Sequence, residues 1–270
     1  MPLVAVLQMV STSITQDNLN TIECYCREAR DQGAVLLALP ENFASMGLSD
    51  EAKIRLAEPY RDGPIQTAVS QLAKSYGLWI IAGSIPLKSK GLRTTASCLV
   101  YDADGACVAR YDKIHLFDVR VSPHEAHQES LTIEPGIDIV VADTPIGRVG
   151  LSVCYDVRFP ELYRQLVLKG ADVLVIPAAF TAVTGKAHWD ILVRARAIET
   201  LCYVLAPNQG GVHPNGRKTY GHSLIVDPWG EVLATTKEGP DLLVAELVLQ
   251  RVEDLRRGFP CNEHHVLDLS

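Results

Sequence analysis

The sequence lacks any apolar run long enough to cross a membrane. Its longest apolar stretches, such as residues 173–180, are far shorter than the roughly 20 residues that a transmembrane helix requires. The N-terminal segment MPLVAVLQ is apolar, but it has neither the basic region nor the small-residue cleavage site of a signal peptide, so it predicts a first strand. We therefore expect no membrane partner.

An excess of basic residues is also missing. The chain has 25 Lys and Arg against 32 Asp and Glu, a net charge of −7, which argues against a protein that binds nucleic acid through its charge. The seven cysteines are odd in number and show no framework spacing, which is typical of a reducing compartment rather than of a disulfide scaffold. We therefore expect a cytoplasmic protein.

No Gly/Ser linker, charge run or low-complexity tract divides the 270 residues. Their number fits two domains or one large α/β domain equally well. Because 47% of the residues are hydrophobic and 21% are charged, the chain can bury a substantial core, and general disorder is excluded.

Short Val/Ile/Leu runs alternate with amphipathic segments along the whole chain, which predicts an α/β fold. Several runs are apolar on both faces, as expected for strands that are covered on each side. Residues 139–153 are typical of a hairpin, so we expect mixed sheets. Helices are expected at 64–77, 160–170 and 188–201, and around a stripe at helical spacing formed by Leu19, Ile22, Cys26 and Ala29. The strand-like runs are 3–9, 35–39, 78–83, 96–101, 149–153, 173–176, 202–206, 223–226 and 242–247.

Two distant segments are similar to each other. Residues 33–43 (GAVLLALPENF) align without gaps with residues 170–180 (GADVLVIPAAF), so that Gly, Ala, Leu, Pro and Phe recur in register. Any helix–strand unit that ends in a turn could show this pattern, and so could two similar α/β halves; the sequence leaves both open. Only the first copy has an acid after the proline, since Glu41 stands where the second copy has Ala178.

The strongest local signal is the segment 150–161, GLSVCYDVRFPE. An apolar strand would place Cys154 at its C-terminal end, where open α/β sheets bind their ligands. The thiol would then face a cleft, and the next backbone N–H, that of Tyr155, could act as an oxyanion donor. A buried core cysteine is the alternative, and it is what we expect for the other six cysteines.

A catalytic thiol needs a base, and histidine is the usual one. His115, His188 and His222 have no acid beside them in an obvious orienting pattern. The run HEAH at 124–127 is one residue short of the H-E-x-x-H zinc motif, so the helical ligand geometry fails. We expect neither a metal site nor a cofactor.

Two charged residues stand in otherwise apolar sequence: Glu41 follows LALP directly, and Lys113 lies in RYDKIHLF. Taken alone, each would be read as a solvated side chain. Together with Cys154, the motifs LPENF, YDKIHLFD and VCYDVRFPE resemble the three signature blocks of the nitrilase superfamily of carbon–nitrogen hydrolases, in the same order. The blocks at 177–189, 194–203 and 220–230 resemble its Nit branch.

The resemblance covers essentially the whole chain and implies a four-layer α-β-β-α sandwich with mixed sheets. It implies a single carbon–nitrogen hydrolase domain over residues 1–270, assembled as a homodimer or a higher homo-oligomer. Cys154 would be the nucleophile, supported as a thiolate by a nearby Lys113 cation, and Glu41 would move protons. Lys113 and the Tyr155 N–H would hold the oxyanion. Glu129 best matches a further acid that orients the site, although a solvated loop acid would look the same.

The Nit branch implies a small-molecule amide substrate. The expected reaction is hydrolysis of deaminated glutathione to 2-oxoglutarate and cysteinylglycine through a thioester. An omega-amidase acting on 2-oxoglutaramate and an N-carbamoyl amidohydrolase are alternatives within the same class. A binding or scaffold protein that keeps the fold without turnover is the alternative from another class.

The leaving-group side of such a substrate needs room and polar contacts. The candidates for these contacts, each of which could equally be a structural hydrogen-bonder, are Asn42, His188 and Arg194. Behind the cysteine, a salt-bridged structural frame is expected from Asp156, Arg158 and Glu161.

Overall fold

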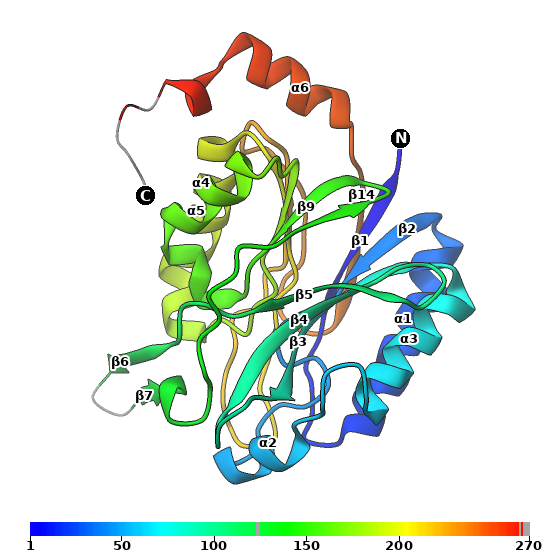
Figure 1. The fold of residues 1–270 in the computed structure, drawn as a ribbon, viewed down its shortest axis with the longest axis vertical. Helices are drawn as coiled ribbons and strands as arrows, with labels where there is room; N and C mark the ends of the chain where they lie inside the picture. Colours follow the sequence, from blue (N-terminus) through cyan, green and yellow to red (C-terminus); the bar gives the residue numbers. More distant parts are fainter. Residues whose placement is uncertain (123–124, 265, 267–270) are drawn as a thin grey trace.

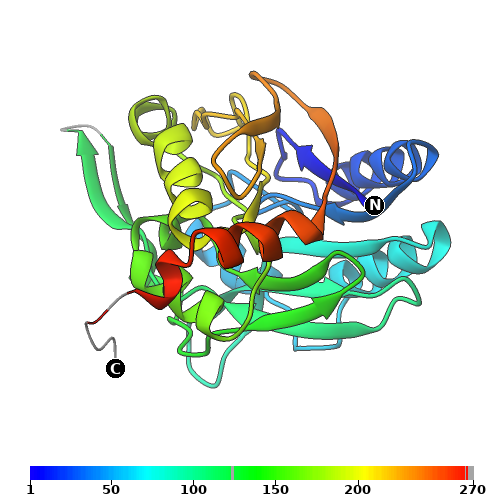
Figure 2. The same ribbon diagram turned by 90° about the horizontal axis from the view of Figure 1, so that it is seen from above.

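Two six-stranded β-sheets lie face to face at the centre of the structure, a computed structural model that describes residues 1–122, 125–264 and 266. Helices cover the outer face of each sheet, so that a helical layer, two sheets and a second helical layer follow one another (Figures 1 and 2). The predicted four-layer α-β-β-α sandwich with mixed sheets is confirmed.

The first sheet is built from strands of the N-terminal half and one strand near the C-terminus. Across the sheet these strands are β14 (Asp241–Glu246), β1 (Leu3–Gln8), β2 (Ala34–Ala38), β3 (Trp79–Lys88), β4 (Thr94–Tyr101) and β5 (Cys107–Asp112). The pairs β1–β2 and β2–β3 are parallel, and the other neighbours are antiparallel. Two helices lie along its outer face, α1 (Thr15–Asp31) and α3 (Pro64–Tyr76).

The second sheet is built from the C-terminal half. Across the sheet its strands are β8 (Val141–Thr144), β9 (Gly147–Leu151), β10 (Val173–Val175), β11 (Tyr203–Ala206), β12 (Leu224–Val226) and β13 (Val232–Thr235). The pairs β9–β10 and β10–β11 are parallel, and the others are antiparallel, including the predicted hairpin β8–β9. Its outer face is covered by α4 (Pro160–Leu168) and α5 (Ala182–Thr200).

The two sheets repeat one design. In each, the order of pairings from one edge to the other is antiparallel, parallel, parallel, antiparallel, antiparallel, with β2 and β10 in the same place. The similar segments 33–43 and 170–180 contain these two strands, and each makes the same bridge to the next strand region, Glu41 to Ser84 and Ala178 to Asn208. The structure therefore supports two similar halves rather than a chance likeness of helix–strand units.

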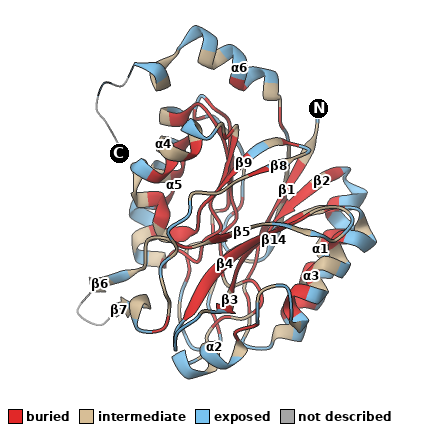
Figure 3. Cartoon of the chain, in the orientation of Figure 1, coloured by how far each residue is buried: buried red, intermediate tan, exposed pale blue. Residues whose placement is uncertain are grey.

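The core follows from the alternation of side chains along the strands. In β1, Val4 and Val6 face the second sheet, while Ala5 and Leu7 face the helices α1 and α3. Figure 3 shows the consequence: the strands are buried along most of their length, and the helices are exposed on their outer faces. Polar groups that lie between the sheets are therefore withdrawn from water.

Several elements were not predicted. The strand β5 and the short strands β6 (Asp118–Ser122) and β7 (Glu125–Gln128), which form a separate hairpin, lack a continuous apolar run. Two helices were missed because they bury almost nothing: α2 (Asp50–Leu56) and α6 (Leu249–Gly258). The helix α5 begins at Ala182 rather than at 188, because the Thr181 side chain caps it by accepting from Thr184 N–H. Within the described residues, no helix is both long and apolar enough to span a membrane.

Candidate active site

Cys154 lies at a sharp turn at the end of β9. It opens a short 3-10 helix (Cys154–Arg158) with a φ of +50°, a left-handed conformation that is costly for a residue with a side chain. Its N–H donates to the carbonyl of Pro177 at 2.8 Å, which ties the turn to the end of β10. The residue is buried, with 8% of its surface exposed.

Glu41 follows β2 and is buried. One carboxylate oxygen, Oε1, lies 3.0 Å from Lys113 Nζ, and the other accepts from the N–H of Ala179 at 2.9 Å. Gly83 in β3 makes this position possible, since a Cβ there would lie 1.9 Å from the carbonyl oxygen of Pro40. Both oxygens of the carboxylate are therefore held, one by each half of the molecule.

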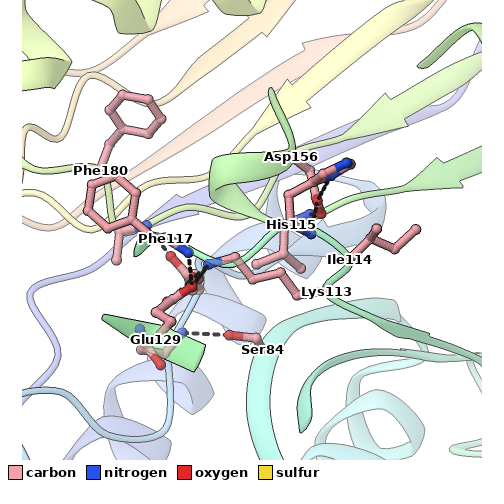
Figure 4. A network of polar contacts seen from close by, with 12 residues as sticks. Ser84, Lys113, Ile114, His115, Phe117, Glu129, Asp156 and Phe180 are labelled. Atoms are coloured by element: carbon pink, nitrogen blue, oxygen red, sulfur yellow. Dashed lines mark hydrogen bonds and ion pairs between the residues drawn. The ribbon is translucent and has the colours of Figure 1, made fainter. Parts of the chain in front are cut away.

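Lys113 follows β5 and is 1% exposed. Its ammonium also contacts Glu129, with Nζ 2.8 Å from Oε2 and 3.1 Å from Oε1. Glu129 begins a short 3-10 helix (Glu129–Leu131) and accepts from the Phe117 N–H at 2.8 Å. Figure 4 shows Lys113 and Glu129 pointing toward one another, while His115 points to Asp156 on the other side. The structure thus brings all four residues Glu41, Lys113, Glu129 and Cys154 together.

The two carboxylates determine the charge of Lys113. Burial alone would lower the pKa of Lys113, but the Glu129 and Glu41 carboxylates raise that pKa well above its ordinary value. Burial would likewise raise the pKa of Glu129, but Lys113, the Phe117 N–H and the charge of Arg217 lower it. The resting site therefore holds a protonated lysine between two acids.

Three surroundings act on the pKa of the Cys154 thiol. Burial raises the pKa of Cys154 well above its ordinary value, the nearby Glu41 carboxylate raises it further, and Lys113 opposes both. The Lys113 cation therefore acts on the thiol in the expected direction, but burial and Glu41 outweigh it. Lys113 is itself held at hydrogen-bond distance by Glu41 and Glu129. A thiol whose pKa is raised needs a base before it can act as a nucleophile.

The backbone N–H of Tyr155 has no hydrogen-bond acceptor among the residues that the structure describes. It directly follows Cys154 in the 3-10 helix, and the Tyr155 side chain lines the same cavity as Cys154. A donor without a partner beside a nucleophile is what an oxyanion site requires.

A cavity of about 250 Å³ opens over these residues. Its size suits a small molecule and is slightly below the range of about 300–1,000 Å³ that is typical of pockets for drug-sized ligands. Glu41, Lys113, Glu129 and Cys154 lie at one part of its wall. Polar side chains elsewhere on the wall include Asn42, Ser84, Thr95, Thr181, Asn215 and Arg217.

One of the three expected substrate contacts lies at the cavity. Asn42 lines the cavity, but His188 and Arg194 do not. Both lie on α5, where His188 is exposed and contacts the Arg158 guanidinium, and Arg194 donates to the Gly230 carbonyl at 2.9 Å. The helical spacing of α5 turns these side chains away from the site, which the sequence blocks alone did not reveal.

Asp156 is fully buried, but its partner is not Arg158. It accepts from Val153 N–H at 2.8 Å, Tyr111 OH at 2.7 Å and His115 N–H at 3.0 Å, and it lies 2.7 Å from His115 Nδ1. The expected salt-bridged frame is therefore wrong, and Arg158 stacks on Phe180 instead. Asp156 connects the segment before Cys154 to the segment around Lys113.

Sequence reasoning also missed residues of the site. The Ala179 N–H, which holds Glu41, carries no signal in its side chain. Arg217 lines the cavity from a loop between β11 and β12, and the one available signal was a charged residue beside the block at 220–230. In the part of the chain that is described, no cluster of three His, Cys, Asp or Glu residues could hold a metal ion. His124 of the HEAH run lies outside the described residues.

The sequence was compared with known proteins. A family model of carbon–nitrogen hydrolases matches residues 3–257. The deaminated glutathione amidase of Yersinia enterocolitica is 42% identical to this chain over 267 residues, which make up 97% of this chain and 92% of that protein. The likeness therefore extends over nearly the full length of both proteins.

Comparison with solved structures likewise finds similarity over nearly the full length of this chain. The Caenorhabditis elegans NitFhit protein superposes with a TM-score of 0.92 and 38% sequence identity, covering 98% of this chain and 65% of that one. An amidase from Nesterenkonia sp. AN1, which carries an acrylamide adduct on its active-site cysteine, superposes with a TM-score of 0.80 and 25% identity over 97% of this chain and 100% of that one. Both similarities extend over the two sheets and their helices.

Proposed function

This chain belongs to the carbon–nitrogen hydrolase family, and we propose that it is an amidase that hydrolyses deaminated glutathione to 2-oxoglutarate and cysteinylglycine. The observation that carries the proposal is the cluster of Glu41, Lys113, Glu129 and Cys154 at the wall of one cavity. The likeness to deaminated glutathione amidases over nearly the whole chain supports the substrate.

Acylation begins with the protonated thiol. Cys154 attacks the amide carbonyl carbon while Glu41 takes the thiol proton, which the raised pKa of the thiol makes necessary. Lys113 and the Tyr155 N–H bind the oxyanion that forms on the carbonyl oxygen. Glu41 then passes its proton to the amide nitrogen, the C–N bond breaks, and cysteinylglycine leaves from a thioester.

Deacylation uses the same groups. Glu41 takes a proton from water as the water attacks the thioester carbonyl, and the oxyanion again lies against Lys113 and the Tyr155 N–H. The C–S bond breaks, the thiolate of Cys154 recovers the proton from Glu41, and 2-oxoglutarate leaves. Glu129 reacts with nothing in this scheme; it orients Lys113 and keeps it protonated.

The proposed substrate differs from 2-oxoglutaramate by the cysteinylglycine on its amide nitrogen. Contacts to that remote portion lower the barrier at the reacting centre, so the longer substrate gains in kcat/KM. We expect a preference of at least about tenfold, roughly 1.4 kcal/mol of differential transition-state binding. Steady-state kinetics that follow cysteinylglycine in one assay and ammonia in the other test this.

An opposite preference in that assay would favour the omega-amidase alternative and leave the catalytic residues in place. Release of carbon dioxide and ammonia from an N-carbamoyl amino acid would favour the carbamoyl amidohydrolase. Mass spectrometry of the intact protein after rapid quenching should show Cys154 carrying the 2-oxoglutaryl group. Absence of both turnover and the adduct, with every amide tried, would leave the non-enzymatic scaffold as the better interpretation.

We further propose that the protein works in the cytoplasm as a homodimer. The described cysteines are all unpaired, as suits a reducing compartment. Ile191 and Ile198 on one face of α5 are exposed, as is Trp229, whose neighbour Gly230 packs on Ile198. An exposed apolar patch of this kind favours a contact with a second copy. Sedimentation of wild type and Ile191→Glu would detect that contact.

A further inference from the structure

Arg217 lies in the wall of the active-site cavity, where its charge lowers the pKa of Glu129 but no described carboxylate lies at ion-pair distance from it. Its Nη2 donates to the carbonyl of Ala179 at 3.2 Å, but its Nε is buried and has no hydrogen-bond partner among the described residues. No ion pair joins Arg217 to any acid in the described part of the chain. A buried guanidinium N–H without an acceptor is costly unless a ligand supplies one.

The loop that carries Arg217 is held in place. His213 is buried, and its ring nitrogens contact the Ser11 carbonyl at 2.9 Å and Thr219 Oγ1 at 2.8 Å. The N–H of His213 donates to the carbonyl of Arg217 at 2.9 Å, and Asn215 Oδ1 accepts from the N–H of Arg217 at 3.1 Å. These hydrogen bonds fix the backbone of the turn from which the Arg217 side chain extends.

The other cations in the cavity wall are already neutralised. Lys113 contacts the carboxylates of Glu41 and Glu129, and Lys53 lies 3.3 Å from Asp50 at the outer part of the wall. Arg217 is thus the one cation of the described wall whose charge is not matched by a contacting carboxylate. Arg217 donates to the carbonyl of Ala179, and the N–H of the same residue donates to Glu41. Ala179 therefore connects the guanidinium to the proposed base.

We propose that Arg217 binds a carboxylate of the substrate and so selects anionic amides over neutral ones. The inference rests on the proposed function, because deaminated glutathione carries two carboxylates: one on the 2-oxo acid end and one on the glycine of the leaving group. The planar guanidinium can donate through Nε and one Nη to both oxygens of a carboxylate, which a lysine cannot reproduce. The buried Nε then gains the acceptor that the protein does not provide.

Arg217→Met and Arg217→Lys test the proposal against four amides. 2-Oxoglutaramate has only the oxo-acid carboxylate, N-butyryl-cysteinylglycine has only the glycine carboxylate, deaminated glutathione has both, and butyramide has none. We expect Arg217→Met to lower kcat/KM at least about tenfold for the amides that carry the recognised carboxylate, and less than about threefold for butyramide. Arg217→Lys should recover part of the loss.

The pattern of losses identifies the carboxylate. A loss confined to 2-oxoglutaramate and deaminated glutathione assigns the oxo-acid end, and one confined to the two cysteinylglycine amides assigns the leaving-group end. Equal losses for all four amides, butyramide included, would mean that Arg217 only supports Ala179, and would overturn the proposal. Arg257→Met removes the same charge from an exposed position on α6 and should change no ratio.

A second measurement does not depend on turnover. Iodoacetate and iodoacetamide alkylate a thiol alike but differ in one carboxylate, so the ratio of their rates at Cys154 reports on an anion site beside the thiol. Arg217→Met should lower the iodoacetate-to-iodoacetamide ratio at least about fivefold, from the loss of a charge-assisted contact. An unchanged ratio would overturn the proposal. If no amide were hydrolysed while the ratio fell as expected, the proposed function would fail and the carboxylate site would remain.

Discussion

Glu41 and Lys113 form an ion pair of 3.0 Å in which both side chains are almost completely buried. The two residues follow β2 and β5 of the first sheet, whereas Cys154 follows β9 of the second. The remaining oxygen of Glu41 accepts from Ala179, which also belongs to the second half. The proposed base and oxyanion cation thus come from one half of the molecule, and the nucleophile comes from the other.

Replacement of the nucleophile should abolish the reaction. We expect Cys154→Ala to show no turnover and no covalent adduct, while its melting temperature stays close to that of wild type because only one sulfur is lost. Cys24→Ala removes an exposed cysteine and serves as the control. Substantial amidase activity in Cys154→Ala would remove this residue from its proposed role.

Lys113→Met should reduce both activity and stability. The change keeps the volume of the side chain but removes an oxyanion donor, so kcat should fall at least about 10²-fold. It also leaves Glu41 buried beside an apolar group, and a loss of about 3–5 kcal/mol in the free energy of unfolding is expected. Kinetics and chemical denaturation of the same preparation measure the two effects.

Glu41→Gln tests the role of the base while leaving the Lys113 cation in place. The amide keeps the size of the side chain and leaves Lys113 its contact with Glu129, so the protein should fold and still lose turnover by about 10²-fold or more. Near-normal kcat in both Glu41→Gln and Lys113→Met would contradict the proposed roles of these two residues even if Cys154 were essential.

Asp156→Asn should be strongly destabilising. Each carboxylate oxygen of Asp156 accepts from two groups, and an amide offers only one oxygen, so two buried donors would lose their acceptor. We expect a loss of about 2–5 kcal/mol in the free energy of unfolding and a lower kcat, since the segments of Cys154 and Lys113 are both held by this residue. Arg158→Met, which removes no ion pair with an acid, should cost less than about 1 kcal/mol. A larger effect for Arg158 than for Asp156 would restore the salt-bridged frame.

Mild acid should weaken the fold through His213. Burial lowers the pKa of His213 below its ordinary value of 6.5, and the Arg217 charge adds to this, while the Ser11 carbonyl opposes both. Below about pH 6.5, His213 is therefore protonated in the unfolded chain but still neutral in the folded chain. The free energy of unfolding consequently decreases as the pH falls below about 6.5, by at most about 1.4 kcal/mol per pH unit. Unfolding of His213→Gln between pH 7.5 and 5.5 should show a shallower loss than wild type. His188→Gln, which removes an exposed histidine, is the control; equal slopes for all three proteins would contradict the assignment.

The sequence alone was sufficient for the layered α/β architecture. It also singled out Glu41, Lys113, Glu129 and Cys154, which the structure brings together and whose catalytic roles stay a prediction. Strands covered on both faces leave continuous apolar runs, and a helix between a proline and a glycine has marked ends, so these elements are visible locally. A charged residue directly after such a run is conspicuous for the same reason. The similarity of 33–43 to 170–180 also indicated the two halves, although only the equal pairing order of the sheets decided between its two interpretations.

Tertiary structure decided everything that depends on contacts between distant residues. Glu41 meets Lys113 across 72 positions and Ala179 across 138, and no local pattern records such distances. The direction of the Cys154 pKa shift followed from burial and from the Glu41 carboxylate, which together outweigh the opposite effect of Lys113. For the same reason, only the structure showed that His188 and Arg194 lie away from the cavity and that Arg217 lines it. Which side of a helix or loop faces a cavity is determined by how the two sheets pack together, and that packing is a property of the whole chain.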